Sequence, residues 1–163
     1  MLKKIAYGLL AALVIIQFFR PEKNLSTAKS PNDISNKYTL SADVEGILKT
    51  SCYDCHSNNT VYPWYFNIQP VAWWLQDHVN EGKRELDFSE FLTYSPKKAR
   101  HKLEEVNDLV KEGEMPLASY TIIHRNAKLS EEQKLTIANW ATGLMNEITT
   151  ANNLPPEEKR ENK

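Results

Sequence analysis

Cysteine and glycine are both scarce in this 163-residue sequence, which has two cysteines, five glycines and a formal net charge of −1. The two cysteines are three positions apart, so a disulfide between them would close a very short loop and add little stability. The near-neutral charge gives no electrostatic reason to expect nucleic acid as a partner. No internal repeat or low-complexity array is present. We therefore expect one globular domain with tails, in which the cysteine pair has a chemical use.

The N-terminus carries the pattern of an export signal. Two lysines precede an apolar run over residues 5–19 that only Gly8 and Gln17 interrupt. No small-x-small cleavage site follows, so residues 1–21 are predicted to be an uncleaved signal anchor, a transmembrane helix in the inner membrane. That topology would place the rest of the chain in the periplasm, within the cell envelope. The alternatives are a cleaved signal peptide and a buried core helix, although the run lacks the polar face of a core helix.

Changes in composition mark the domain boundaries. Residues 22–37 are mostly polar and contain few large apolar side chains, which predicts a flexible linker. Residues 150–163 contain two adjacent prolines followed by mixed charges, and they are predicted to form a disordered tail. The domain itself is predicted to span residues 38–149.

Between the tails the apolar residues follow a helical period, and no convincing period-two alternation is present. This pattern predicts an all-α fold. Val44, Ile47 and Leu48 form an apolar stripe that begins shortly after Ser41, a suitable N-cap. The helix that they define would lead directly into the cysteine pair.

Three further helices are predicted from their end signals. One covers residues 70–81, with proline at its start and Gly82 as its stop signal. Another covers residues 96–112 and has Gly113 where a C-terminal cap belongs. The last begins at Ser130, which with the glutamine three positions later makes a capping box.

The cysteine pair belongs to the run Cys52-Tyr53-Asp54-Cys55-His56. This spacing puts two thiols and an imidazole on one helical turn, where the thiols can add to the vinyl groups of haem and the imidazole can ligate its iron. We therefore predict one covalently attached haem c. A dithiol redox pair is an alternative, but it would need a strand–helix context. A zinc site is another, but no second cysteine pair completes the usual ligand set.

A sixth ligand for the haem iron is expected from Met115. It follows the predicted helix over residues 96–112, and Pro116 prevents the segment from continuing as helix. Ligation by histidine and methionine stabilises ferrous iron and leaves no open position for dioxygen. Met145 lies on the apolar stripe of the last helix and is expected in the core instead. Three histidines are alternative ligands that would lower the potential: His78, His101 and His124.

Several features beyond the haem motif suggest a family. They are the stripe of Val44, Ile47 and Leu48, the runs Pro63-Trp64-Tyr65 and Gly113-Glu114-Met115-Pro116, and Trp140 near the end. With them, residues 38–145 resemble the small haem-binding domain proteins of Bacteroidetes-type bacteria. The resemblance implies a fold like class I cytochrome c, with His56 as proximal ligand and Met115 as distal ligand. It also implies that the first and last domain helices cross, packing Val44, Ile47 and Leu48 against Ile137, Trp140 and Leu144.

The expected function is electron transfer by a carrier that docks redox proteins of the cell envelope. No distal acid–base set and no small-molecule substrate can be assigned, so we do not predict an enzyme. The alternative is a peroxidase-like enzyme or a gas or redox sensor with a displaceable sixth ligand, for which His124-Arg125 is the one adjacent distal pair. A structural subunit in which haem only holds the fold together is a third possibility. Aromatic residues are expected to wall the haem edge: Tyr62, Trp64, Tyr65, Phe66, Trp73 and Trp74.

Overall fold

The computed structural model describes residues 1–155. These residues form α-helices and short 3-10 helices without any strand, and their one β-type pairing is an isolated bridge between Leu25 and Asn59. The prediction of an all-α fold is therefore confirmed for this part of the chain. The α-helices are α1 (Leu2–Ile16), α2 (Ala42–Ser51), α3 (Tyr53–His56), α4 (Val71–Glu85), α5 (Pro96–Glu112), α6 (Ala118–Thr121) and α7 (Glu131–Ala151). The 3-10 helices are η1 (Ile34–Asn36), η2 (Trp64–Asn67), η3 (Phe88–Thr93) and η4 (Arg125–Ala127).

The predicted capping residues begin and end three of these helices. The Ser41 hydroxyl accepts a hydrogen bond from the backbone N–H of Val44 and so caps α2. Gly113 ends α5 with a φ of 79°, a left-handed conformation that glycine adopts without steric cost. Ser130 and Gln133 form the complete capping box at the start of α7. These local contacts explain why the sequence places the helix ends well.

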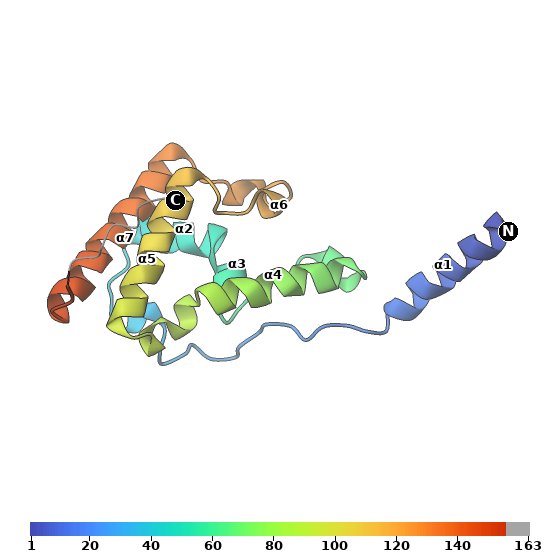
Figure 1. Cartoon of the computed structure of the whole chain (residues 1–163), viewed down its shortest axis with the longest axis horizontal. Coiled ribbons are helices and arrows are strands. Elements are labelled where there is room, and N and C mark those ends of the chain that lie inside the picture. Colours follow the sequence, from blue (N-terminus) through green and yellow to red (C-terminus); the bar gives the residue numbers. More distant parts are fainter. Residues whose placement is uncertain (156–163) are drawn as a thin grey trace.

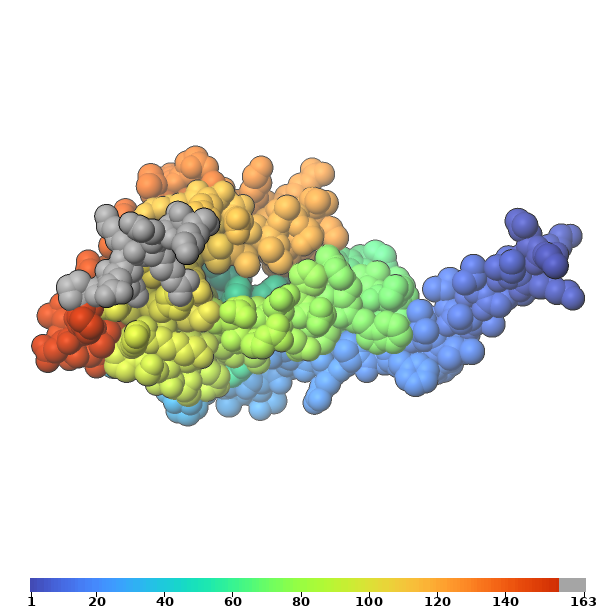
Figure 2. Space-filling view, viewed as in Figure 1, coloured from blue at the N-terminus to red at the C-terminus, as the bar shows by residue number. Residues whose placement is uncertain are grey.

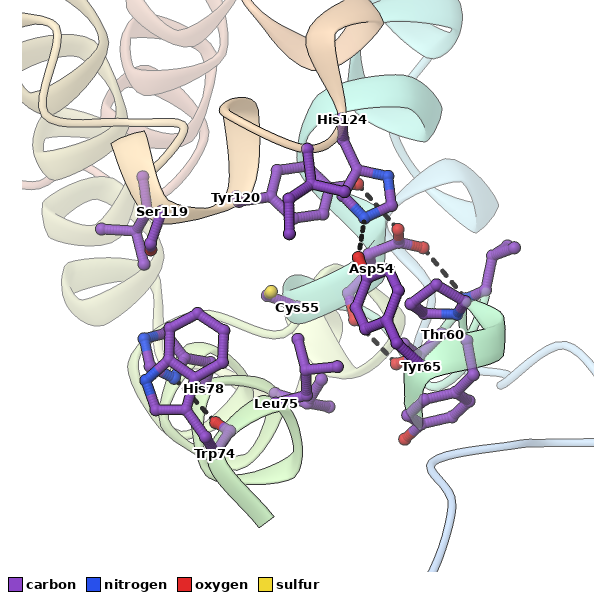
Figure 3. Close-up of a pocket in the computed structure, with 16 residues that line it drawn as sticks. Asp54, Cys55, Thr60, Tyr65, Trp74, Leu75, His78, Ser119, Tyr120 and His124 are labelled. Atoms are coloured by element: carbon purple, nitrogen blue, oxygen red, sulfur yellow. Dashed lines mark hydrogen bonds between the residues drawn. The ribbon is translucent and has the colours of Figure 1, made fainter. Parts of the chain in front are cut away.

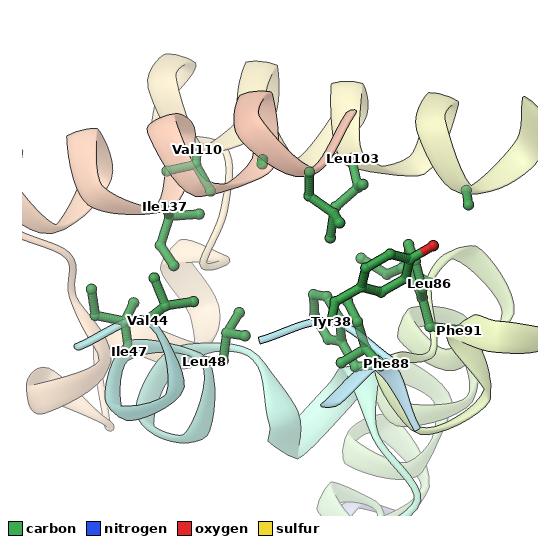
Figure 4. Close-up of a cluster of buried hydrophobic side chains, with 14 of the residues drawn as sticks. Tyr38, Val44, Ile47, Leu48, Leu86, Phe88, Phe91, Leu103, Val110 and Ile137 are labelled. Atoms are coloured by element: carbon green, nitrogen blue, oxygen red, sulfur yellow. The ribbon is translucent and has the colours of Figure 1, made fainter. Parts of the chain in front are cut away.

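The core lies where α2 meets the paired helices α5 and α7 (Figure 1). In Figure 4, Val110 of α5 and Ile137 of α7 lie above Val44 and Ile47 of α2. Trp140 of α7 packs beside this cluster. The crossing of α2 and α7 that the family resemblance implies is therefore present. Burial of each large aliphatic side chain in such a core contributes about 1.5–3 kcal/mol.

Helix α4 does not stop at Gly82 as predicted but continues through this residue to Glu85. A glycine occupies this position inside the helix for a steric reason. A Cβ atom on Gly82 would lie 2.8 Å from the carbonyl oxygen of Cys55 and 2.9 Å from the Cβ of Cys55. Gly82 therefore permits α4 to approach the cysteine motif closely, and its small size matters more here than its weak helix propensity.

The predicted flexible linker over residues 22–37 is bound to the domain in this structure. The side-chain amide of Asn24 donates to the carbonyl of Ser57 at 2.8 Å, and Asn32 accepts from the backbone N–H of Leu92 at 2.9 Å. Ile34, in η1, is completely buried in the core. Composition alone suggested a linker because these contacts are made by a few polar side chains and one isoleucine, with no periodic pattern.

The predicted tail boundary at residue 149 also shifts. Helix α7 continues to Ala151, and Leu154 packs against the core. The guanidinium of Arg100 donates to the carbonyl of Pro155 at 2.6 Å. The rest of the predicted tail, residues 156–163, lies outside the described residues.

At the other end, α1 extends away from the domain and buries no side chain (Figures 1 and 2). Among residues 1–155, no helix combines the length and apolar character needed to cross a membrane. At 15 residues, α1 is about 22 Å long, against a bilayer hydrocarbon core of about 30 Å. The prediction of a transmembrane helix over residues 1–21 is therefore not supported.

Replacing Gly82 with alanine tests the close approach of α4 to the cysteine motif. The added methyl group meets backbone atoms that cannot move freely, so Gly82→Ala should lower the free energy of unfolding by about 1–3 kcal/mol. Urea unfolding followed by circular dichroism measures the change. In the matched control Gly46→Ala, the new methyl has no atom within 4 Å. That variant should gain about 0.5–1 kcal/mol from its better helix propensity. Equal stability of the two variants would contradict the packing described here.

Candidate functional site

The run from Cys52 to His56 sits at the junction of α2 and α3. Cys52 is the C-cap of α2, and its backbone N–H donates the last helical hydrogen bond, to the carbonyl of Leu48 at 2.9 Å. The carbonyl of Cys52 in turn accepts from the backbone N–H of His56 at 3.0 Å. Both cysteines are free. The predicted arrangement of two thiols and one imidazole on a single turn is therefore present.

Both thiols are held in the protonated form. Burial, with a smaller contribution from Cys55, raises the pKa of Cys52 to about 12. Burial and the charge of Asp54 raise the pKa of Cys55 to about 11. A dithiol redox pair and a zinc site both depend on thiolates, which this environment disfavours. Within residues 1–155, no group of three or more His, Cys, Asp or Glu side chains is arranged to hold a metal ion.

The His56 ring is oriented by one hydrogen bond. Its Nδ1 donates to the carbonyl of Leu86 at 2.9 Å, and its ring meets that of Phe88 edge-on at 6.5 Å between centroids. Burial lowers the pKa of His56, which keeps the imidazole neutral. Because Nδ1 carries the proton, Nε2 keeps its lone pair. A histidine that ligates a metal is usually neutral, with its other ring nitrogen held by a hydrogen bond as Nδ1 is here.

A hollow lies beside Cys55, between α4 and residues 117–124 (Figure 2). Figure 3 shows the Cys55 sulfur inside it, with Ser119 and Tyr120 on one side and Trp74 and Leu75 on the other. We call it the Cys55 hollow. Its lining is mostly aromatic and aliphatic, as a large apolar cofactor requires.

Two polar contacts tie residues 117–124 to the haem motif across this hollow. The hydroxyl of Tyr120 donates to Oδ2 of Asp54 at 2.7 Å, and the Tyr65 hydroxyl is hydrogen-bonded to Nε2 of His124 at 3.0 Å. The rings of Tyr120 and His124 stack at 4.4 Å between centroids. Burial and the hydrogen bond to Asp54 raise the pKa of Tyr120, so its hydroxyl stays protonated. Sequence reasoning missed Asp54 and Tyr120, and the position of Asp54 between the two cysteines was the one available signal.

The structure separates the candidate sixth ligands. His78 and His124 line the Cys55 hollow, whereas Met115 lines a neighbouring hollow together with Arg125. Met115 also packs against the core, as does Met145. His101 lies elsewhere, on α5, within 3.1–3.4 Å of two glutamates. Cys55 thus shares its hollow with two of the three candidate histidines.

Comparison with protein-family models gives a match to the haem-binding domain over residues 11–143. The chain belongs to the haem-binding domain family. Comparison with curated proteins and with solved structures gives no significant match.

The residues of this haem-binding domain fit the group that the family name implies. Two protonated thiols lie on the same turn as a neutral imidazole whose Nε2 keeps its lone pair. The hollow beside Cys55 offers the apolar walls that a haem needs. Cys55 points into the hollow, whereas Cys52 packs against the hydrophobic core and, like His56, does not line the hollow.

A double-mutant cycle tests whether Tyr120 and Asp54 hold residues 117–124 over the hollow. Tyr120→Phe and Asp54→Ala should couple by about 1–3 kcal/mol in the free energy of unfolding, because each variant removes the same charge-assisted hydrogen bond. Thermal unfolding of the single and double variants gives this coupling. Tyr94→Phe removes a hydroxyl that is bonded to Asp87 instead, so it should not couple to Asp54→Ala. If Tyr120→Phe and Asp54→Ala coupled as weakly as this control pair, the Tyr120–Asp54 hydrogen bond would contribute nothing to the free energy of unfolding.

Proposed function

We propose that this haem-binding protein is a c-type haem protein with one haem bonded to Cys52 and Cys55 and ligated by His56. Each thiol would add its S–H across a vinyl double bond, forming one C–S and one C–H bond without an external oxidant. The observation that carries the proposal is the His56 ring, which lies on the same turn as the two thiols and whose Nδ1 donates to the Leu86 carbonyl, so that Nε2 keeps its lone pair.

We propose electron transfer as the activity, with Met115 as the sixth ligand. When bound, the haem would supply an iron that cycles between ferric and ferrous states. The thioether of Met115 would stabilise the ferrous form, and its segment leads from the end of α5 directly to residues 117–124 over the Cys55 hollow. Aromatic side chains such as Tyr65 and Trp74 would exclude water from the site.

His78 is the competing sixth ligand. It lines the Cys55 hollow, and its Nδ1 is hydrogen-bonded to the carbonyl of Trp74 at 2.8 Å, which leaves Nε2 for a metal. His124 is less suited, because Tyr65 already occupies its Nε2. Ligation by a second histidine would give a carrier of lower potential.

An enzyme with a distal acid–base pair is less well supported than a carrier. The adjacent pair His124-Arg125 is split between two hollows, since His124 lines the one beside Cys55 and Arg125 lines the one beside Met115. A peroxidase-like or ligand-sensing site would need both groups near one open iron position.

For location, we propose that α1 inserts its apolar side chains into the inner membrane and that the domain lies in the periplasm. No side chain of α1 is buried against the domain, and two lysines lie in its first turn. Redox proteins of the cell envelope are the proposed partners for electron exchange.

Covalent attachment can be tested by intact-mass spectrometry of protein from a host with cytochrome c maturation. The mass should exceed that of the polypeptide by one haem, which acidified organic solvent should not extract. The double variant Cys52→Ala/Cys55→Ala should lose all covalent haem, whereas Tyr53→Phe, between the two cysteines, should keep it. Extractable haem in the unmodified protein would refute the c-type assignment.

The sixth ligand can be tested by redox titration of the haem-loaded protein. Met115→Ala should lower the midpoint potential by more than about 100 mV and open the iron to carbon monoxide, because axial ligands tune haem potentials over roughly 0.8 V. His78→Ala should leave the potential unchanged. Met145→Ala, which also truncates a methionine packed against the core, should alter stability but not the potential. If the midpoint potential instead changed in His78→Ala and not in Met115→Ala, the sixth ligand would be His78.

A further inference from the structure

Gln17 interrupts the apolar N-terminal run, and the structure shows what this amide does. Its Nε2 donates to the carbonyl of Gln69 at 3.2 Å, and its Oε1 accepts from the backbone N–H of Gln69 at 2.9 Å. The side chain of Gln17 thus pairs with both polar backbone groups of one residue in the domain. Gln69 is only 3% exposed, so this contact is shielded from water.

A second pair of hydrogen bonds follows two residues later. The carbonyl of Phe19 accepts from Nε2 of Gln69 at 2.9 Å and from the indole N–H of Trp73 at 2.8 Å. The end of α1 is therefore joined by four hydrogen bonds to the segment between η2 and the first turn of α4. Figure 1 shows this end of α4 as the part of the domain nearest to α1.

Large apolar side chains are exposed around this junction. Trp64 is 75% exposed, Ile68 44% and Trp73 40%, and we call these three residues the Trp edge. Phe18 and Phe19 at the end of α1 are also exposed. Exposed apolar side chains therefore lie on both sides of the junction at which Trp73 bonds to Phe19, which is unusual for a surface that faces only water.

We propose that the Trp edge rests in the interfacial layer of the same lipid bilayer that receives α1. Tryptophan favours this layer, because its ring is apolar and its indole N–H is polar. A bilayer is favoured over a protein partner because Gln17 and Gln69 fix the edge to the end of α1. The inference rests on the proposed membrane insertion of α1.

The orientation has a consequence for electron transfer. Trp74 neighbours the Trp edge in sequence and also lines the Cys55 hollow. A domain seated on its Trp edge therefore holds the haem site near the membrane surface. Partners within or on the membrane would then reach the haem without a long diffusive search by the domain.

Photo-crosslinking tests this seating with the full-length, haem-loaded protein. The protein is reconstituted in vesicles of phosphatidylcholine and phosphatidylglycerol containing a phospholipid with a diazirine close to its headgroup, and adducts are mapped by mass spectrometry. We expect adducts in α1 and on the Trp edge. Leu135 on α7 is also an exposed apolar residue, at 60%, and should carry none. Adducts in α1 alone would overturn the seating and leave membrane insertion intact, while a lack of adducts everywhere would overturn both.

The variant Gln17→Leu tests the coupling of α1 to the edge. Leucine keeps the run apolar but removes both hydrogen bonds to Gln69, so the adduct yield on the Trp edge relative to α1 should fall at least about threefold. Leu135→Ala, far from the junction, should leave this ratio unchanged. An unchanged ratio in Gln17→Leu would overturn the role of the Gln17–Gln69 pair in orienting the domain.

Discussion

The contact between α4 and the turn that carries Cys52, Cys55 and His56 determines the geometry of the site. Gly82 lets the helix approach until a Cβ atom would touch Cys55, and three residues later the chain leaves α4 so that Leu86 presents its carbonyl to His56. One close approach therefore fixes the backbone of the motif and the orientation of its imidazole. A larger residue at the contact would displace both.

The environment of the motif favours uncharged side chains. Burial keeps the two thiols protonated and the imidazole neutral, and these states go together because each is the uncharged form. A dithiol redox pair and zinc-ligating cysteines would both need the thiols in their deprotonated form. These low-polarity surroundings are those that a haem-binding domain needs around an apolar macrocycle.

Polar contacts of single residues organise the surroundings of the site. Tyr120 holds residues 117–124 to Asp54, Asn24 holds the N-terminal segment to the loop after the motif, and Gln17 fixes the end of α1 to Gln69. Each contact connects segments that lie far apart in the sequence. Together they make the chain leading to the domain part of its structure, in place of the free tether that composition suggests.

The sequence by itself determined the helical fold, the turn that brings two cysteines and a histidine together, and most helix ends. These features depend on local chemistry, such as the hydroxyl of Ser130 reaching its own helix or two thiols sharing one turn. Only the tertiary structure decided that Gly82 lies inside a helix, that residues 22–37 are bound, and that Met115 and Cys55 border different hollows. Those features depend on which distant segments meet, and a residue's own type and sequence neighbours carry no record of a contact with a distant part of the chain.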